Sequence, residues 1–129
     1  LKWHKKVVLN LNGEIVASSF NSQRLDKNAT SHAEIKAIGE AGAKLGNKNL
    51  NDCLIYCTCE PCLMCLSAIV YAKLKKLVFG LSLEDTKPEA SSFVSVSLDE
   101  FLLKSSRKFE VTRNFMEAEC KVLIDKDAR

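Results

Sequence analysis

At 129 residues the chain is long enough for one domain with a single hydrophobic core, and too short for two. Hydrophobic residues make up 47% and charged residues 27%, the balance of a folded globular protein, which excludes a disordered chain. The net charge of +3 is a weak signal, because small groups of lysine and arginine usually form a solvated surface rather than a nucleic-acid site.

The hydrophobic residues do not form a membrane-spanning segment. No apolar run approaches the roughly 20 residues that cross a bilayer, and the amino-terminal stretch does not resemble a signal peptide. We therefore expect a cytoplasmic protein with no membrane contact. In a reducing compartment its six cysteines are expected to serve metal binding or catalysis rather than disulfides.

The predicted elements alternate between strands and helices. In chain order they are strands over 6–11 and 14–19, a polar loop over 21–29, a helix over 31–45, a strand over 54–58, a helix over 61–72, a strand over 76–80, a capped helix over 97–104, a strand over 109–112 and a helix over 115–123. Asn12-Gly13 predicts a hairpin turn, Gly46 ends the first long helix, and Pro61 begins the second. This alternation indicates an α/β fold.

One carboxylate lies on the apolar side of the first long helix. At about 100° per residue, the apolar stripe of that helix is formed by Ile38, Ala41 and Leu45. Glu34 is in line with this stripe, and burying an unpaired charge is costly. Two interpretations stay open: a capping box in which Ser31 is the N-cap, or a chemical role for the carboxylate.

Two cysteines begin the second long helix. Cys62 and Cys65 are three residues apart, so both sulfurs emerge on one side of the first turn, where the helix dipole favours thiolates. With one imidazole they make a three-ligand zinc site with an open fourth position, which is the catalytic rather than the structural arrangement. A carboxylate beside such a metal has a reason to be buried.

The segment His32-Ala33-Glu34 followed by Pro61-Cys62-Leu63-Met64-Cys65 resembles the zinc-dependent cytidine/deoxycytidylate deaminase superfamily, in its guanine deaminase and tRNA adenosine deaminase-like branch. The likeness extends from NGEIVASSFN through LIYCTCEPCLMC to FMEAEC. It implies a three-layer α-β-α fold around a mixed sheet of about five strands. It further implies a single deaminase domain over residues 1–129, without the amino-terminal helix of the family.

The resemblance also assigns roles to residues. His32, Cys62 and Cys65 would bind one Zn²⁺ per chain. Glu34 would take a proton from the attacking water and deliver protons to the ring nitrogen and the leaving ammonia. Asn21 would hydrogen-bond the base or the sugar. The implied reaction is hydrolytic deamination of a nucleobase or nucleoside by a homodimer.

The sequence predicts the substrate less well than the reaction. We expect a free nucleobase or nucleoside, with an aminopurine such as guanine ahead of cytosine or cytidine. An adenosine in a tRNA anticodon ranks second because RNA recognition calls for exposed aromatic side chains. Four of the phenylalanines instead fit a core: Phe93, Phe101, Phe109 and Phe115. A catalytically silent binding protein of the same fold is a further alternative.

Three departures separate the chain from the purine-specific branch. Asn28-Ala29-Thr30 stands where that branch commonly has Asp-Pro-Thr, and Lys6-Val7 stands where a Gly-Ala pair often lines the pocket. Residues 121–129 lack the aromatic tail of guanine deaminases. The apolar second helix, including Leu66 and Tyr71, has two open interpretations, core or subunit interface.

The other cysteines of the cluster are interpreted as bystanders. Cys57 is a small buried hydrophobe on a strand, and Cys59 a loop residue near the site but not a ligand. A ferredoxin-type run would need a cysteine where Ile69 stands. A structural four-cysteine zinc site or a Cys62–Cys65 redox pair would leave the His32–Glu34 pair unexplained.

Overall fold

A computed structural model of the chain describes residues 6–83 and 94–127. The strands are β1 (Lys6–Leu11), β2 (Glu14–Phe20), β3 (Cys53–Cys59), β4 (Lys76–Leu81) and β5 (Glu110–Thr112). The helices are α1 (Gln23–Asp26), α2 (Ala33–Leu45), α3 (Leu63–Tyr71), α4 (Leu98–Lys104) and α5 (Glu117–Asp127). The expected strands and long helices are therefore confirmed, with ends that differ by a few residues.

The hairpin between β1 and β2 forms where the Asn-Gly pair predicted it. Asn12 and Gly13 have φ of 52° and 86°, the left-handed values that a two-residue turn requires. The Gly13 N–H donates to Asn10 Oδ1 at 2.9 Å, which closes the turn on one side. Both residue types tolerate positive φ, so the turn sets the register of the two strands.

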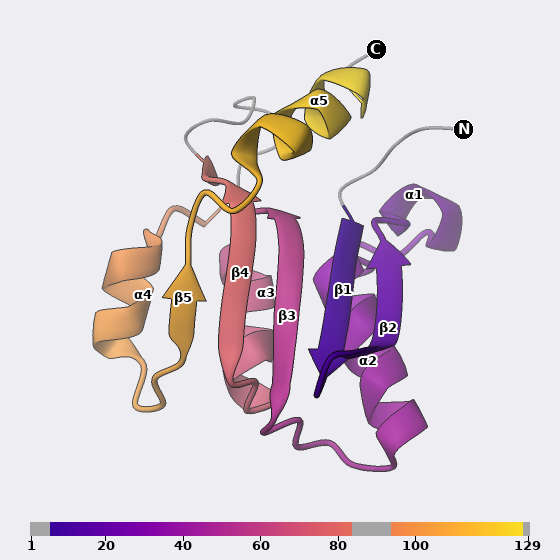
Figure 1. Cartoon of the computed structure of the whole chain (residues 1–129), viewed down its shortest axis with the longest axis vertical. Coiled ribbons are helices and arrows are strands. Elements are labelled where there is room, and N and C mark those ends of the chain that lie inside the picture. The colour runs from indigo at the N-terminus through magenta and orange to yellow at the C-terminus, as the bar shows by residue number, and fades with distance from the viewer. Residues whose placement is uncertain (1–5, 84–93, 128–129) are drawn as a thin grey trace.

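The strands form one mixed sheet in the order β2-β1-β3-β4-β5 (Figure 1). β1 is antiparallel to both β2 and β3, whereas β4 is parallel to both β3 and β5. The four strands β2, β3, β4 and β5 therefore run in the same direction, and their carboxyl ends lie at the same end of the sheet. The mixed five-stranded α/β sheet confirms the expected fold class.

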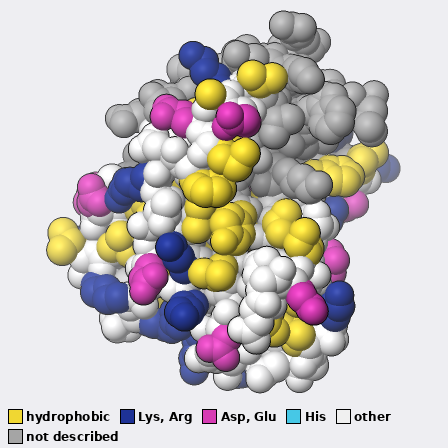
Figure 2. Space-filling view, viewed as in Figure 1, with side chains coloured by type: hydrophobic (Ala, Val, Ile, Leu, Met, Phe, Trp, Pro, Cys, Tyr) yellow, Lys and Arg dark blue, Asp and Glu magenta, His cyan; other side chains and the backbone are white. Residues whose placement is uncertain are grey.

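Helices lie on both faces of the sheet. α2 and α3 cover one face (Figure 1), and the side chains beneath them, Leu9, Ile55 and Leu77, are fully buried. On the other face, hydrophobic side chains remain visible over the middle of the sheet (Figure 2). The half-buried Tyr56 belongs to this face, because side chains alternate along a strand and its neighbour Ile55 is on the first face. The chain leading into α5 lies on this second face, because the ring of Phe115 is 6.1 Å from that of Tyr56.

α5 approaches β4 closely at one glycine. A Cβ atom on Gly80 would lie 2.9 Å from the Thr58 carbonyl oxygen and 2.8 Å from Cys120 Cβ on α5. Such contacts do not occur between real atoms, so any larger residue at Gly80 must displace the helix. Glycine in this strand therefore has a packing function.

α2 is rotated relative to the expected orientation. Its buried residues are Ala33, Ala37 and Ala41, whereas Ile38 is half-buried and Leu45 is 38% exposed. Three alanines on one side allow the helix to approach the sheet, a close packing that the larger side chains would prevent. The expected stripe is therefore confirmed at Ala41 and in part at Ile38, which packs against the core, and is wrong at Leu45.

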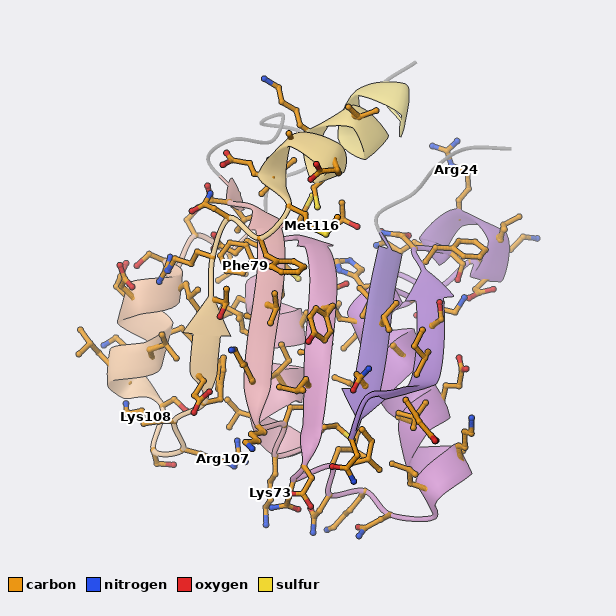
Figure 3. All side chains as sticks on the ribbon, in the orientation of Figure 1. Arg24, Lys73, Phe79, Arg107, Lys108 and Met116 are labelled. Carbon is orange, nitrogen blue, oxygen red and sulfur yellow. The ribbon has the colours of Figure 1, made fainter. Side chains whose placement is uncertain are left out.

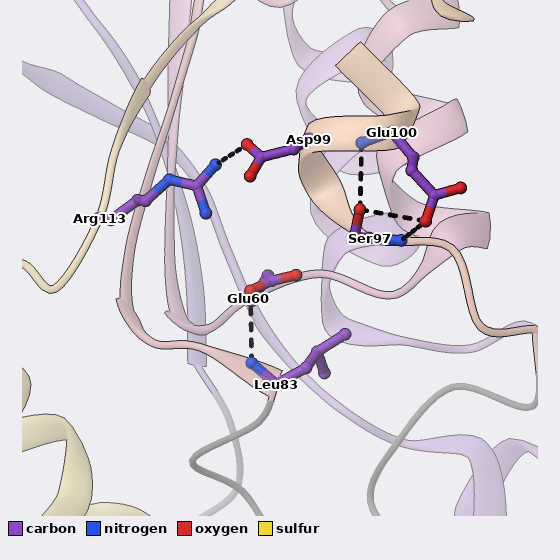
Figure 4. Close-up of polar contacts among 6 residues, drawn as sticks. All are labelled: Glu60, Leu83, Ser97, Asp99, Glu100 and Arg113. Atoms are coloured by element: carbon purple, nitrogen blue, oxygen red, sulfur yellow. Dashed lines mark hydrogen bonds and ion pairs between the residues drawn. The ribbon is translucent and has the colours of Figure 1, made fainter. Parts of the chain in front are cut away.

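The expected capping box at Ser31 is also wrong. The N-cap of α2 is His32, which makes no side-chain cap hydrogen bond. Ser31 belongs to the preceding loop, because its carbonyl oxygen accepts from the Ser22 N–H at 3.1 Å. The capping box expected at residues 97–104 does form: Ser97 Oγ accepts from the Glu100 N–H at 3.1 Å, as Figure 4 shows.

Other expectations need smaller corrections. The polar loop contains the single-turn helix α1, and Cys59 is the last residue of β3 rather than a loop residue. Phe109 is buried as expected and Phe101 half-buried, but Phe115 is 46% exposed. Phe93 lies outside the described residues.

The second long helix contributes to the core on one side only. Leu66 and Ile69 are buried and belong to the hydrophobic core, whereas Tyr71 is 85% exposed.

Within the described residues, no helix is long and apolar enough to cross a membrane.

At the amino ends of β4 and β5, cationic side chains bond the carbonyl groups that follow two helices. Arg107 donates to the Lys73 and Leu74 carbonyl oxygens at 2.7 and 2.9 Å, just beyond α3. Lys108 Nζ donates to the Leu102 and Ser105 carbonyl oxygens at the end of α4. Figure 3 shows Lys73, Arg107 and Lys108 together at this end of the molecule, away from Met116 and Arg24.

Candidate metal centre and active site

The three predicted metal ligands meet beyond the carboxyl end of β3. His32 Nδ1 lies 3.6 Å from Cys62 Sγ and 3.5 Å from Cys65 Sγ. The two sulfur atoms are 3.7 Å apart. A tetrahedral zinc ion with bonds of about 2.3 Å to sulfur and about 2.05 Å to nitrogen requires separations of about 3.8 Å and about 3.6 Å. The triangle therefore fits a zinc ion without rearrangement.

Both ligand-bearing segments are helix N-termini. His32 is the N-cap of α2 and Cys62 the N-cap of α3, with extended backbones (ψ 151° and 173°). The N-cap side chain ordinarily accepts a hydrogen bond from its own helix. His32 makes no such bond, whereas the backbone N–H groups of Met64 and Cys65 lie close enough to favour the thiolate of Cys62. Both side chains are thus directed at a shared point, with the positive ends of two helix dipoles beside it.

The two thiols are electrostatically unequal. The hydrogen bond with Cys65 lowers the pKa of Cys62 to about 5, with help from backbone N–H groups and His32, and against the effect of burial. The same hydrogen bond raises the pKa of Cys65, as do burial and the charge of Glu34. Two thiolates and one imidazole are the donor set that zinc prefers, so the residues present fit this ion.

Glu34 lies beside the ligands, as predicted. It is the second residue of α2 and is half-buried. Its negative charge raises the pKa of Cys65 and also that of Cys57 on β3, so the carboxylate is within electrostatic reach of both thiols. A carboxylate in this position can accept and return a proton next to the metal site.

Asn21 lies in the loop between β2 and α1. Its Oδ1 accepts from the Gln23 N–H at 3.0 Å, and its Nδ2 donates to Gln23 Oε1 at 3.0 Å. The adjacent Ser22 N–H donates to the Ser31 carbonyl oxygen, next to His32. The loop thus holds Asn21 near the start of the ligand-bearing helix, although the sequence did not predict the role of Gln23.

The remaining cysteines of the cluster lie outside the group formed by His32, Cys62 and Cys65. Cys57 is buried on β3, as predicted, and burial together with Glu34 and Cys59 raises its pKa well above the ordinary value. Cys59 is buried at the end of the same strand. Neither belongs to the group of ligand atoms that lie within 4.8 Å of one another.

Glu60 is a buried acidic residue that the sequence analysis did not single out. Its Oε1 accepts from the Leu83 N–H at 3.3 Å (Figure 4), and its own N–H donates to the Leu81 carbonyl oxygen at 2.7 Å. These bonds attach the turn between Cys59 and Cys62 to the end of β4. The only sequence signal was its place immediately before the Pro-Cys pair, which does not distinguish an anchor from a solvated residue.

Known proteins similar to this chain include several deaminases. A tRNA-specific adenosine deaminase from Buchnera aphidicola subsp. Baizongia pistaciae is 33% identical over 117 residues, which cover 91% of this chain and 70% of that protein. Another from Rickettsia typhi is 50% identical over 76 residues, 59% of this chain and 51% of that protein. The chain thus spans only about half the length of the Rickettsia relative.

Solved structures agree with the sequence relatives. A tRNA:A34 deaminase, studied for A-to-I editing at the wobble position, superimposes with a TM-score of 0.78 at 29% identity, covering 92% of this chain and 83% of that one. A guanine deaminase from Bacillus subtilis superimposes with a TM-score of 0.61 at 29% identity, covering 81% and 82%. The expected superfamily, that of the nucleoside deaminases, is confirmed.

The fold and the site define an enzyme of the hydrolytic class, one that cleaves a C–N bond and releases ammonia. Residues 3–119 match the MafB19-like deaminase family, and the chain belongs to that family.

Proposed function

We propose that this chain deaminates adenosine to inosine in a tRNA. The observation that carries the proposal is the likeness to two relatives, 33% and 50% identical, that are both named tRNA-specific adenosine deaminases. The sequence analysis ranked a free aminopurine first and tRNA second. The preference for guanine is not confirmed, and we now place the tRNA substrate first.

Two exposed aromatic side chains support an RNA substrate. Phe20 ends β2 and is 48% exposed, and Phe115 follows β5 and is 46% exposed. Both lie at the edge of the sheet where His32 and the cysteines meet, since Phe115 N–H donates to the Phe79 carbonyl oxygen near the end of β4. Aromatic faces at the rim of a site are what unpaired bases stack on.

The proposed reaction adds water to the ring carbon that bears the amino group and then breaks the C–N bond. His32, Cys62 and Cys65 would hold Zn²⁺, which when bound lowers the pKa of water and so supplies the nucleophile at neutral pH. Glu34 takes a proton from that water and passes it to the ring nitrogen. It then takes the remaining proton from the hydroxyl group that has been added to the ring carbon and gives it to the departing amine. The C–N bond breaks, ammonia leaves and the carboxylate is restored. Asn21 binds the base.

Guanine deamination is the second candidate, on the likeness to the Bacillus subtilis guanine deaminase. We rank it second because the two sequence relatives that support the proposal are named tRNA-specific adenosine deaminases, not guanine deaminases.

One panel of substrates tests the proposal. Ammonia release is measured for an anticodon stem-loop RNA, adenosine, guanine, cytosine and cytidine, and inosine in the RNA is identified by mass spectrometry. Inosine formed in the RNA, and abolished by Glu34→Gln, supports the proposal. Turnover of guanine alone contradicts it and selects the second candidate.

A further inference from the structure

The loop between β2 and α2 is held by a chain of hydrogen bonds that passes through one glutamine. Gln23 accepts from Asn21 Nδ2 through its Oε1 at 3.0 Å. It donates to the Ala29 carbonyl oxygen through its Nε2 at 2.8 Å. Its backbone N–H donates to Asn21 Oδ1 at 3.0 Å. Gln23 therefore bonds both atoms of the Asn21 amide and joins them to the residue three positions before His32.

The hydrogen bonds of Asn21 and Gln23 determine which atom of each side-chain amide is oxygen and which is nitrogen. A backbone N–H can only donate, so the atom of Asn21 that faces Gln23 N must be oxygen. A carbonyl oxygen can only accept, so the atom of Gln23 that faces Ala29 must be nitrogen. Turning over either side-chain amide would bring two donors or two acceptors together. The orientation of the Asn21 amide is thus fixed before any substrate binds.

The fixed amide retains a defined hydrogen-bonding capacity. Asn21 has two N–H groups and two oxygen lone pairs, and Gln23 occupies one of each. One donor and one acceptor remain, on a half-buried side chain near the start of α2. This pair complements adenine, whose N7 accepts and whose amino group donates on one edge. On guanine the neighbour of N7 is the O6 acceptor, which would face Asn21 Oδ1.

We propose that Gln23 is a positioning residue for base recognition, a role that rests on the proposed function of Asn21 as a base-binding residue. Gln23 does not touch the base. It holds the Asn21 amide so that the remaining N–H is presented to ring N7 and the remaining oxygen lone pair to the amino group. The enzyme then favours the adenine edge without a reorientation step.

The loop that carries Asn21 is also attached to α2, the helix that begins after His32. This attachment holds the Asn21 amide at a fixed position as well as in a fixed orientation. The Ser22 N–H donates to the Ser31 carbonyl oxygen at 3.1 Å, and Lys36 Nζ on α2 donates to Ser22 Oγ at 2.6 Å. The neighbouring Asn28 closes the same loop without contacting Asn21: its Oδ1 accepts from the Thr30 N–H and the Thr30 hydroxyl. Asn28 is therefore a matched control for Gln23.

The test combines a protein change with a substrate change. kcat/KM is measured on an anticodon stem-loop with adenosine or 7-deazaadenosine at the target position, because the second lacks the N7 acceptor. In the unmodified enzyme we expect loss of N7 to lower kcat/KM about tenfold, the effect of one hydrogen bond in a desolvated site. In Gln23→Leu we expect the two substrates to differ by less than about twofold.

Two further variants separate positioning from a general effect on the loop. Asn28→Ala lowers the activity on both substrates equally and keeps the tenfold dependence on N7. Gln23→Glu keeps an acceptor for Asn21 Nδ2 but loses the donor to the Ala29 carbonyl oxygen, so we expect a dependence on N7 between that of the unmodified enzyme and that of Gln23→Leu. If Gln23→Leu retains the full dependence, or if Asn28→Ala loses it as well, Gln23 has a merely structural role and the inference is wrong.

A measurement independent of turnover completes the test. In a ¹⁵N NMR spectrum the side-chain amide of Asn21, assigned by its loss in Asn21→Asp, should show one proton protected from exchange, and Gln23→Leu should remove that protection. Equal exchange in both proteins overturns the inference. If the unmodified enzyme forms no inosine in RNA, the proposed function fails, and the NMR result still decides whether Gln23 fixes Asn21.

Discussion

The two ends of the sheet use helix termini in opposite ways. At the carboxyl end of β3, the first turns of α2 and α3 meet, and their N-cap side chains, His32 and Cys62, lie 3.6 Å apart. At the amino ends of β4 and β5, Arg107 and Lys108 bond the carbonyl groups beyond α3 and α4. Both arrangements suit the helix dipole, which is positive at the N-terminus and negative at the C-terminus.

The difference between the two ends lies in what remains available. At the amino ends of β4 and β5, the cationic side chains already form hydrogen bonds with backbone carbonyl groups, so that end contributes stability. At the ligand-bearing end the side chains and the first-turn N–H groups are directed at a common point, so that end can bind and react. Substitutions should therefore separate function from stability according to the end at which they are made.

The largest effect is expected from removal of a metal ligand. Cys65→Ser replaces a buried thiol at 3.5 Å from His32 Nδ1 with a poorer zinc ligand. We expect metal affinity to fall by more than about a hundredfold and deamination to be lost. Metal analysis by mass spectrometry checks this, with Cys57→Ala as a control that keeps about one zinc per chain. Full zinc occupancy in Cys65→Ser would contradict the assigned ligand set.

Glu34→Gln comes next, because it removes the proton carrier and keeps the shape of the side chain. We expect kcat to fall by about 10²- to 10⁴-fold while the zinc content stays unchanged. Steady-state ammonia release and metal analysis on the same sample check the two halves of this expectation. Activity within a few-fold of the unmodified enzyme would remove Glu34 from the mechanism.

The unequal thiols predict a selective reaction after metal removal. Since the pKa of Cys62 is lowered from 9.0 to about 5, its thiolate in the folded protein persists down to about pH 5, whereas in the unfolded chain it is lost below about pH 9. Between these values, chelated but folded protein should be alkylated by iodoacetamide at Cys62 and not at Cys65. Peptide mass spectrometry across pH 4–9 checks this. Equal labelling of both cysteines would contradict it.

The sign of the corresponding stability effect follows from the same shift. A lowered folded-state pKa means that the thiolate of Cys62 stabilises the metal-free fold above about pH 9, and that this contribution disappears as the pH falls through about 5. Metal-free protein should therefore unfold more easily at pH 4.5 than at pH 7. Urea titrations at the two pH values measure the difference.

At the opposite end, Arg107→Met should affect stability alone. It removes hydrogen bonds of 2.7 and 2.9 Å to two backbone carbonyl groups, so we expect a loss of about 1–3 kcal/mol in the free energy of unfolding. Zinc content and kcat should not change. Urea unfolding and the deaminase assay check both points, and a loss of activity without a loss of stability would contradict the separation of the two ends.

The smallest effect is expected from Arg113→Met. Arg113 pairs with Asp99 at 2.7 Å (Figure 4), but the two side chains are 42% and 81% exposed. Exposed ion pairs contribute little, so we expect less than about 1 kcal/mol, and less still in high salt. Arg113→Met is thus a matched comparison for Arg107→Met, and a larger effect at Arg113 would reverse the expected order.

The parts of the molecule predicted best are those with strong local signals. The Asn12-Gly13 turn, the apolar strands and the Ser97 cap were found because each depends on adjacent residues. The ligands were found because a helix that begins at a Cys-x-x-Cys pair has few other uses, and because a resemblance connected it with His32. In both cases the information lies in short sequence motifs.

The parts predicted poorly depend on contacts made across the chain. α2 buries three alanines more fully than Ile38 and leaves Leu45 exposed, because the distance to the sheet decides which side is buried, and the helix pattern does not contain that distance. α1 and the role of Gln23 come from side-chain hydrogen bonds in a polar loop, where hydrophobic periodicity gives no signal. Phe115 is exposed because the chain turns toward α5 there.

The N-cap positions of the two ligands have a consequence for assembly. His32 and Cys62 are 30 residues apart, with all of α2 and β3 between them. A zinc ion joining them would close that segment into a loop, as a disulfide does, and a cross-link over this span removes about 3–4 kcal/mol of chain entropy from the unfolded state. Metal binding would therefore act as a reversible cross-link between the N-termini of α2 and α3. A chelator should lower the melting temperature as well as the activity.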